Sequence, residues 1–132
     1  ITPNDTPFEA GLGWAVKMKS DIDFIGREAL AARAGQPLKK LLTGFTTARD
    51  DIVLVGRETI LRDGKFAGYL TSGGFGYTVG KPIGLGYVRN ADGVDADYVM
   101  SGKYELVVAT EKVKATPFLG PLVDPANARV KG

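Results

Sequence analysis

The side chains available for chemistry in this chain of 132 residues are carboxylates, lysines, tyrosines and hydroxyls. The sequence has no histidine and no cysteine. It therefore lacks the usual general base, a thiolate nucleophile, a disulfide framework and the ligands of most zinc sites. The net charge of +2 is too small to indicate nucleic acid as a partner. No apolar run is long enough to predict a membrane-spanning helix. We find no constellation that predicts catalysis by this chain alone.

Glu9 is the carboxylate with the clearest local pattern. Thr6-Pro7-Phe8-Glu9 has the form of a capping box, in which Thr6 accepts from the Glu9 amide and Glu9 reaches back to Thr6. Gly11 and Gly13 discourage helix, so we expect a single turn. Glu9 is either this cap or a carboxylate that contacts a ligand, and the capping pattern alone explains its presence.

A glycine-rich run spans residues 73–80 and reads GGFGYTVG. Its spacing differs from that of a phosphate-binding loop, because Lys81 is followed by Pro82, and a strand rather than a helix is expected after it. A wide turn between two strands, with glycines at positive φ, is the preferred interpretation. The alternative for Phe75 and Tyr77 is that they are loop aromatics placed over a ligand.

Paired charges elsewhere are best interpreted as surface charges, because they lack the spacing of a calcium loop or a basic groove with stacking aromatics. These pairs are Asp50 with Asp51, Asp95 with Asp97, Lys39 with Lys40 and Lys112 with Lys114. Trp14, the one tryptophan, is expected to pack in a core with its indole N–H hydrogen-bonded.

The elements expected to position these residues begin with a short N-terminal α/β segment. Residues 12–18 are mostly apolar and predict a strand. A helix is predicted near residues 27–34, with Gly26 as its N-cap and Ile25 packed on Leu30. Gly35 and Pro37 end this helix.

From residue 38 onward the pattern predicts strands separated by turns. Asp63-Gly64 predicts a type I′ hairpin turn, and Ser101-Gly102 predicts a second hairpin. The result is a mainly β fold with a roughly six-stranded antiparallel Greek-key β-barrel, whose closure would remove exposed edges. The predicted strands are 38–47, 58–62, 65–71, 81–88, 97–100, 103–109 and 113–118, the fifth being a short hairpin arm.

Three segments, taken in order, resemble the aminomethyltransferase family, the glycine-cleavage T-protein group. The first is TPFEAGLGWAV, residues 6–16, followed by DFIGREAL, residues 23–30. The second is GRETILRDGKFAGYLTSGGFGYTVGKPIGLGYV, residues 56–88, and the third is TPFLGPLVDP, residues 116–125. The sequence of these segments is most similar to the T-protein-like regions of dimethylglycine and sarcosine dehydrogenases or oxidases.

This resemblance implies that residues 1–36 end a folate-binding aminomethyltransferase domain and that residues 37–132 form the C-terminal β-barrel domain. It implies a fragment of a tetrahydrofolate-dependent one-carbon transferase, or of the folate part of a dimethylglycine or sarcosine dehydrogenase. The implied partners are upstream domains of the same protein and a small methylated amine. No catalytic residue is carried over. Glu9 and Trp14 are the residues implied in the folate cavity wall, and an upstream FAD domain is left open.

Two features depart from the family pattern. Its members carry an arginine on the strand that matches residues 104–108, which reads YELVV here, so the acceptor is left open. Flavin-linked relatives often have tyrosine where this chain has Val123. The competing hypothesis is a non-catalytic barrel that serves as a structural or protein-interaction module. The expected compartment is the cytoplasm.

Overall fold

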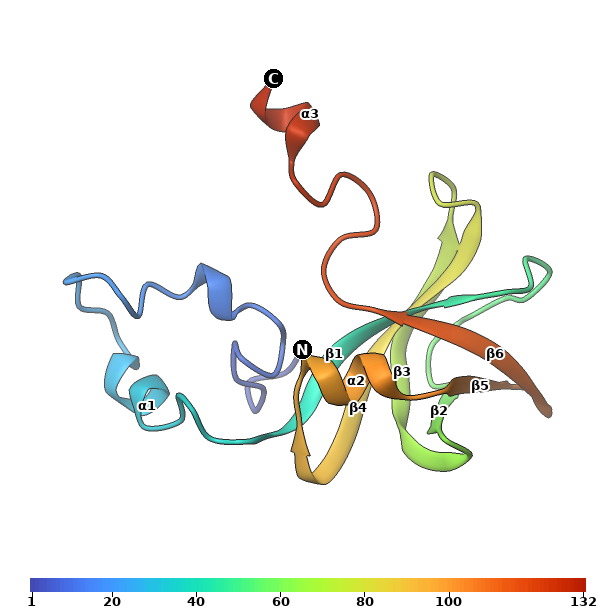
Figure 1. Cartoon of the computed structure of the whole chain (residues 1–132), viewed down its shortest axis with the longest axis horizontal. Helices are drawn as coiled ribbons and strands as arrows, with labels where there is room; N and C mark the ends of the chain where they lie inside the picture. The colour runs from blue at the N-terminus through green and yellow to red at the C-terminus, as the bar shows by residue number, and fades with distance from the viewer.

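The computed structural model describes residues 1–132 and separates into a β-barrel, an N-terminal segment on one side of it and a C-terminal tail that leads away from it (Figure 1). The strands are β1 Leu38–Thr47, β2 Thr59–Arg62, β3 Lys65–Gly76, β4 Lys81–Val94, β5 Tyr104–Val108 and β6 Glu111–Phe118. The helices are α1 Arg27–Ala31, α2 Ala96–Ser101 and α3 Ala128–Lys131, with a 3-10 turn at Gly13–Ala15.

The six strands close into an antiparallel barrel in the order β1-β4-β3-β2-β5-β6. Strands β2, β3 and β4 follow one another as neighbours, and β1 lies beside β4, which is the Greek-key arrangement. The predicted fold class is therefore confirmed. Closure gives every strand a neighbour on both sides over part of its length, and the first half of β1 keeps one edge without a neighbouring strand.

The β2–β3 turn has the geometry predicted from Asp63-Gly64. Arg62 pairs with Lys65 across a two-residue loop. Both turn residues have positive φ, 53° at Asp63 and 77° at Gly64, as a type I′ turn requires. Asp63 also ties the turn to the start of β5, because its carboxylate accepts from the Lys103 amide at 3.1 Å.

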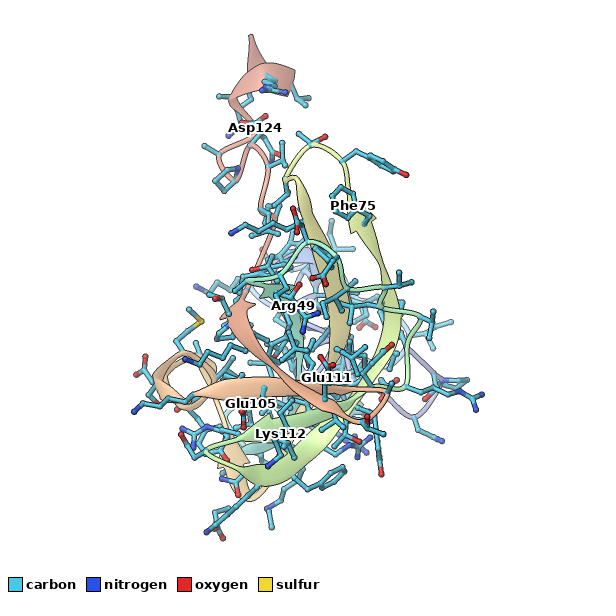
Figure 2. All side chains as sticks on the ribbon, turned by 90° about the vertical axis from the view of Figure 1, so that its right-hand side faces the viewer. Arg49, Phe75, Glu105, Glu111, Lys112 and Asp124 are labelled. Atoms are coloured by element: carbon cyan, nitrogen blue, oxygen red, sulfur yellow. The ribbon has the colours of Figure 1, made fainter.

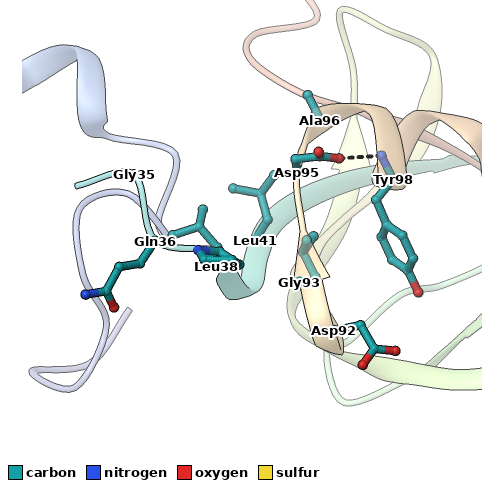
Figure 3. A pocket seen from close by; sticks show the side chains of 11 residues that line it. Gly35, Gln36, Leu38, Leu41, Asp92, Gly93, Asp95, Ala96 and Tyr98 are labelled. Atoms are coloured by element: carbon teal, nitrogen blue, oxygen red, sulfur yellow. Dashed lines mark hydrogen bonds between the residues drawn. The ribbon is translucent and has the colours of Figure 1, made fainter. Parts of the chain in front are cut away.

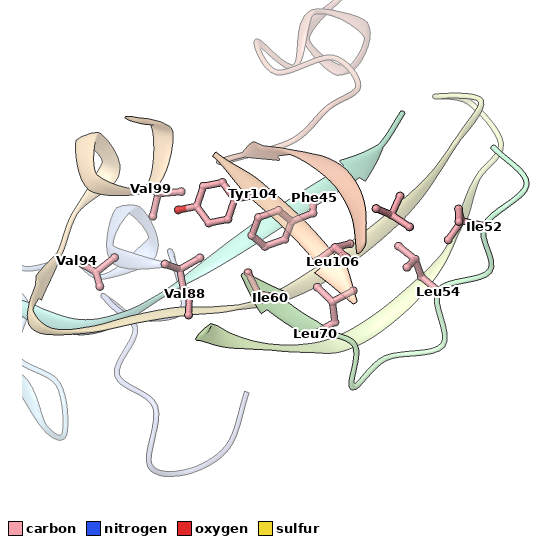
Figure 4. Close-up of a cluster of buried hydrophobic side chains, with 12 residues drawn as sticks. Phe45, Ile52, Leu54, Ile60, Leu70, Val88, Val94, Val99, Tyr104 and Leu106 are labelled. Atoms are coloured by element: carbon pink, nitrogen blue, oxygen red, sulfur yellow. The ribbon is translucent and has the colours of Figure 1, made fainter. Parts of the chain in front are cut away.

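The barrel interior is filled by side chains. Alternating residues of β1 point inward, so that Thr43, Phe45 and Thr47 are buried. Phe45 packs on Tyr104 with ring centroids 5.2 Å apart. Figure 4 shows this cluster running the length of the barrel. Its members are Phe45, Ile52, Leu54, Ile60, Ala67, Leu70, Val88, Val94, Val99, Tyr104, Leu106 and Val113. A filled interior places any ligand site outside the barrel.

Gly44 explains how the last strand closes against the first. It pairs with Phe118 of β6, and the Phe118 ring lies directly over its Cα. A Cβ at position 44 would stand 2.1 Å from this ring, so any larger residue would push β6 outward. The Pro-rich close of the sequence is therefore anchored by a phenylalanine that needs a glycine beneath it.

One predicted hairpin is wrong. Residues 97–100 were expected to be a strand, but Ala96–Ser101 is helix α2. Asp95 caps this helix, since its carboxylate accepts from the Tyr98 amide at 2.7 Å. The helix buries Val99 and covers one end of the barrel. The last strand also begins earlier than predicted, because the β5–β6 turn lies before Glu111.

The N-terminal segment contains no strand, so the expectation for residues 12–18 is wrong. No neighbouring strand is available there to pair with it, and the chain instead makes a 3-10 turn at Gly13–Ala15. Helix α1 begins after Gly26, as predicted, but spans only Arg27–Ala31. Ile25 is fully exposed, so the predicted contact with Leu30 is also wrong. None of the helices has the length and apolar character needed to cross a membrane.

Replacing Gly64 by valine should lower the free energy of unfolding by about 1 kcal/mol or more, because a β-branched residue resists positive φ. Gly74→Ala is the matched control, since a Cβ there meets no atom within 4 Å and its φ is not positive. Urea denaturation midpoints of both variants measure the difference. An unchanged midpoint for Gly64→Val would contradict the turn assignment.

Candidate functional site

Glu9 forms the predicted capping box. Its Oε2 accepts from the Thr6 amide at 2.9 Å and from the Thr6 hydroxyl at 3.0 Å, and the Glu9 amide donates to Thr6 Oγ1 at 3.2 Å. Glu9 also lines a hollow of about 290 Å³ together with Phe8, Arg33 and Lys39. The cap leaves Glu9 partly exposed at this hollow, so capping and ligand contact are compatible.

Trp14 is not a core residue. Its exposed fraction is 85%, which contradicts the expectation that it packs inside. It lines a second hollow, of about 620 Å³, with Phe8, Val16, Met18 and Ala34. Phe8 lines both hollows. The two residues implied in a folate wall therefore occupy neighbouring hollows of the N-terminal segment and do not share one.

Three further residues join this segment to the barrel, and sequence analysis missed them. Asp5 forms a salt bridge with Lys40 of β1, and the two side chains are only 3% and 17% exposed. Lys40 Nζ also lies 5.0 Å from the centroid of the Tyr87 ring on β4. The prediction that Lys40 is a surface charge is therefore wrong. The signal that identifies it is tertiary, because Asp5 lies 35 residues away in sequence.

The electrostatics of this junction follow from its burial and pairing. The hydrogen bond from Lys40, together with the Thr2 amide, lowers the pKa of Asp5 to about 2. Tyr87 is buried, and its hydroxyl has no hydrogen-bond partner in the chain. Burial raises the pKa of Tyr87, and the nearby Asp5 and Glu9 carboxylates raise it further. Tyr87 is therefore a neutral phenol at physiological pH.

The largest hollow, of about 690 Å³, lies where the chain enters β1 (Figure 3). Its walls come from residues 35–38 on one side and from the end of β4 with the start of α2 on the other. Leu38 and Leu41 supply apolar surface, while Asp92 and Asp95 supply carboxylates. Asp95 is engaged as the α2 cap. This hollow and the one around Glu9 thus both lie where residues 35–38 join the barrel, whereas the hollow around Trp14 is formed within the N-terminal segment.

The glycine run connects two strands, as predicted, but it forms the end of a β-hairpin and not a wide turn with its glycines at positive φ. Residues 73–76 belong to β3 and pair with β4, and a turn spans residues 77–80. Only Gly80 of this run has positive φ, 69°. Phe75 and Tyr77 are both exposed and meet edge to face, with centroids 5.3 Å apart. Figure 2 shows Phe75 toward the tip of this hairpin.

The charge pairs of the barrel are structural or exposed. Asp51 and Glu111 both accept hydrogen bonds from Arg49, at 2.7 Å and 2.8 Å. Arg49 and Glu111 are labelled in Figure 2. Pairing with Arg49 lowers the pKa of Asp51. Because these side chains are at least half exposed, the pairs contribute little stability. No group of three or more acidic side chains forms a candidate metal site.

Strand β5 carries no arginine, as its sequence shows. The adjacent strand β2 supplies Arg62, which pairs opposite Tyr104. Its guanidinium is occupied, however, since it donates to Tyr98 O at 3.1 Å and to Asp63 Oδ2 at 2.6 Å. Arg62 also stacks on the Tyr98 ring at 4.0 Å. It therefore fixes α2 on the barrel and does not replace the missing arginine as a free anion ligand.

Comparison with known proteins identifies the barrel. The model of the glycine cleavage T-protein C-terminal barrel domain matches residues 40–124. The chain belongs to this family. Mouse (Mus musculus) mitochondrial sarcosine dehydrogenase is 37% identical over 134 residues, which cover 100% of this chain and 14% of that protein. Mouse mitochondrial dimethylglycine dehydrogenase is 35% identical and covers 95% and 14% of the two chains.

The solved structures agree on the fold. Aminomethyltransferase T of the Bartonella henselae glycine cleavage system matches with a TM-score of 0.76 and 24% identity. The match covers 95% of this chain and 34% of that one. The resemblance inferred from the three sequence segments is confirmed, and with it the family. The chain spans about one seventh of the length of the dehydrogenases that it matches.

The Asp5–Lys40 pair predicts a measurable titration. Folding lowers the pKa of Asp5, so its carboxylate stabilises the fold above its ordinary pKa of 3.8, and this contribution is lost as the pH falls through about 2. Carboxyl-carbon NMR should place the Asp5 midpoint near 2. The Lys40→Met variant should shift the midpoint upward, toward 3.8. Equal midpoints in the two proteins would show that Lys40 is not the cause.

Proposed function

We propose that this chain is the C-terminal part of a folate-dependent one-carbon transfer unit, of the kind attached to sarcosine and dimethylglycine dehydrogenases. In this proposal the barrel and residues 1–36 form one wall of a tetrahydrofolate site, and an upstream region supplies the catalytic groups. The amine would be a small methylated amine. An upstream FAD domain is a further part of the proposal. So is a mitochondrial rather than a cytoplasmic location, because the sarcosine and dimethylglycine dehydrogenases that the chain resembles are mitochondrial.

The observation that carries the proposal is the hollow around Glu9 at the junction of the N-terminal segment and β1. The barrel core is filled, so a ligand wall must lie outside it. A carboxylate acceptor beside the Phe8 ring suits a flat heterocycle with N–H donors, which is the chemistry of a reduced pterin. Charge-assisted hydrogen bonds of this type are stronger than neutral ones.

The composition supports a wall without catalytic groups. The chain has no histidine, and the buried Tyr87 phenol lies against Asp5 and Glu9 rather than in a groove of its own. The proposal therefore assigns binding and positioning to this chain and leaves proton transfer to the upstream region. The start of β1 at Leu38 supports a boundary between the two proposed parts near residue 37.

The isolated chain should bind tetrahydrofolate weakly or not at all, because only one wall of the site is present. Isothermal titration calorimetry of the 132-residue chain tests this expectation. A dissociation constant of about 1 μM or below, which corresponds to about 8 kcal/mol, would contradict the division of the site between regions.

In the longer protein, Glu9→Gln separates the cap from the ligand contact. Glutamine also serves in a capping box, so stability should change little. Loss of an ionic hydrogen bond to the pterin should weaken folate affinity by about 10- to 150-fold, since such bonds contribute about 1.5–3 kcal/mol.

Glu28 is an exposed carboxylate on α1, and Glu28→Gln is the matched control for this variant. Thermal denaturation and folate titration should be measured on both proteins. Unchanged affinity in Glu9→Gln would leave Glu9 as a cap only. Absence of folate binding in the unmodified longer protein would favour the alternative of a structural or protein-interaction barrel.

A further inference from the structure

The main chain of the N-terminal segment is joined to the barrel at two places, both on β1. One attachment is covalent, where the segment enters β1 at Leu38. The other is the Glu9 carbonyl, which accepts from the Leu42 amide at 2.8 Å. Residues 11–36 between these points, here called the strap, include no buried residue. The position of the strap therefore depends on the contacts made by residues 5–10.

The Leu42 amide is free to bind the segment because of how the barrel closes. Strand β6 pairs with β1 only from Gly44 to Thr47. The first half of β1 thus has one edge on β4 and another edge without a neighbouring strand. The Glu9 carbonyl occupies that edge at Leu42. A single backbone hydrogen bond contributes little stability, so without further contacts it would hold the N-terminal segment only weakly on β1.

Lys40 supplies the further contact. It stands two residues before Leu42, bonds Asp5, and lies over the Tyr87 ring. Asp5 is itself held by the Thr2 amide at 2.5 Å. Both charges are largely removed from water, so loss of either one leaves the other unpaired in a poorly hydrated place. This geometry distinguishes Lys40 from Lys39, which is exposed and donates to the Ala91 carbonyl.

We propose that Lys40 is a positioning residue: its salt bridge with Asp5, packed on Tyr87, locks residues 5–10 onto β1 and so holds Glu9 in the hollow beside the strap. The part of the inference that concerns Glu9 rests on the proposed function. The lock itself does not, because it follows from contacts within this chain. Opening the lock would let residues 1–36 swing about the chain entry at Pro37 while the barrel stays folded.

Hydrogen exchange of the 132-residue chain tests the lock without folate. In Lys40→Met, which keeps an apolar stem over Tyr87, the Leu42 amide should exchange about tenfold faster or more, because its acceptor is no longer held in place. The amides of Phe45 and Val88 in the barrel should keep their rates. Lys39→Met is the matched control and should leave Leu42 unchanged.

Asp5→Asn is a second test in case Lys40→Met loses its fold. Because Asp5 lies outside the barrel, this variant breaks the salt bridge without changing a barrel residue. It should reproduce the faster exchange at Leu42. Protection of Leu42 that is unchanged in both variants would overturn the lock. Equal acceleration at Leu42, Phe45 and Val88 in both variants would overturn it too, since it would show destabilisation of the whole fold.

Folate affinity of the longer protein tests the role of Lys40 toward Glu9. If Glu9→Gln weakens binding, Lys40→Met should weaken it by a similar factor. Lys112→Met, at an exposed lysine of β6 that does not line this hollow, should leave binding unchanged. Weakening by Glu9→Gln alone would overturn the positioning role. If Glu9→Gln has no effect, the proposed function of Glu9 fails, and the lock is judged by the exchange rates alone.

Discussion

Strand β1 is the element on which the rest of this structure depends, because its two edges serve three different partners. One edge pairs with β4 along nearly the whole strand. The other edge pairs with β6 from Gly44 to Thr47, which closes the barrel, and then binds Glu9 at Leu42. Closure and attachment of the N-terminal segment thus use the same backbone edge in succession. A longer β6 would exclude the segment, and a shorter one would open the barrel.

The placement of glycine and charge along β1 follows from this double use. Gly44 makes room for the Phe118 ring, which seals the junction with β6. Lys40, four residues earlier, secures the segment by binding Asp5 over Tyr87. A filled core makes the barrel a rigid support. The exposed strap that it carries has little packing of its own, which is typical of a segment completed by another part of a protein.

Family membership and structure together favour a supporting role for this chain. The dehydrogenases that it resembles are about seven times longer. Strand β5 carries no arginine, and the guanidinium of Arg62 on the neighbouring strand β2 is bound to Tyr98 and Asp63. Arg62 is therefore not free to bind an anionic part of a ligand.

The sequence by itself determined the features that local chemistry specifies. Asp63-Gly64 required positive φ, Thr6 and Glu9 formed a capping box, and short predicted strands separated by turns indicated a roughly six-stranded barrel. Tertiary structure decided what depends on distant neighbours. Residues 97–100 became helix because Asp95 caps them and Val99 has a core to enter, while residues 12–18 had no strand to join. Lys40 looked like a surface charge because its partner Asp5 is 35 residues away, and only the folded chain brings the two together.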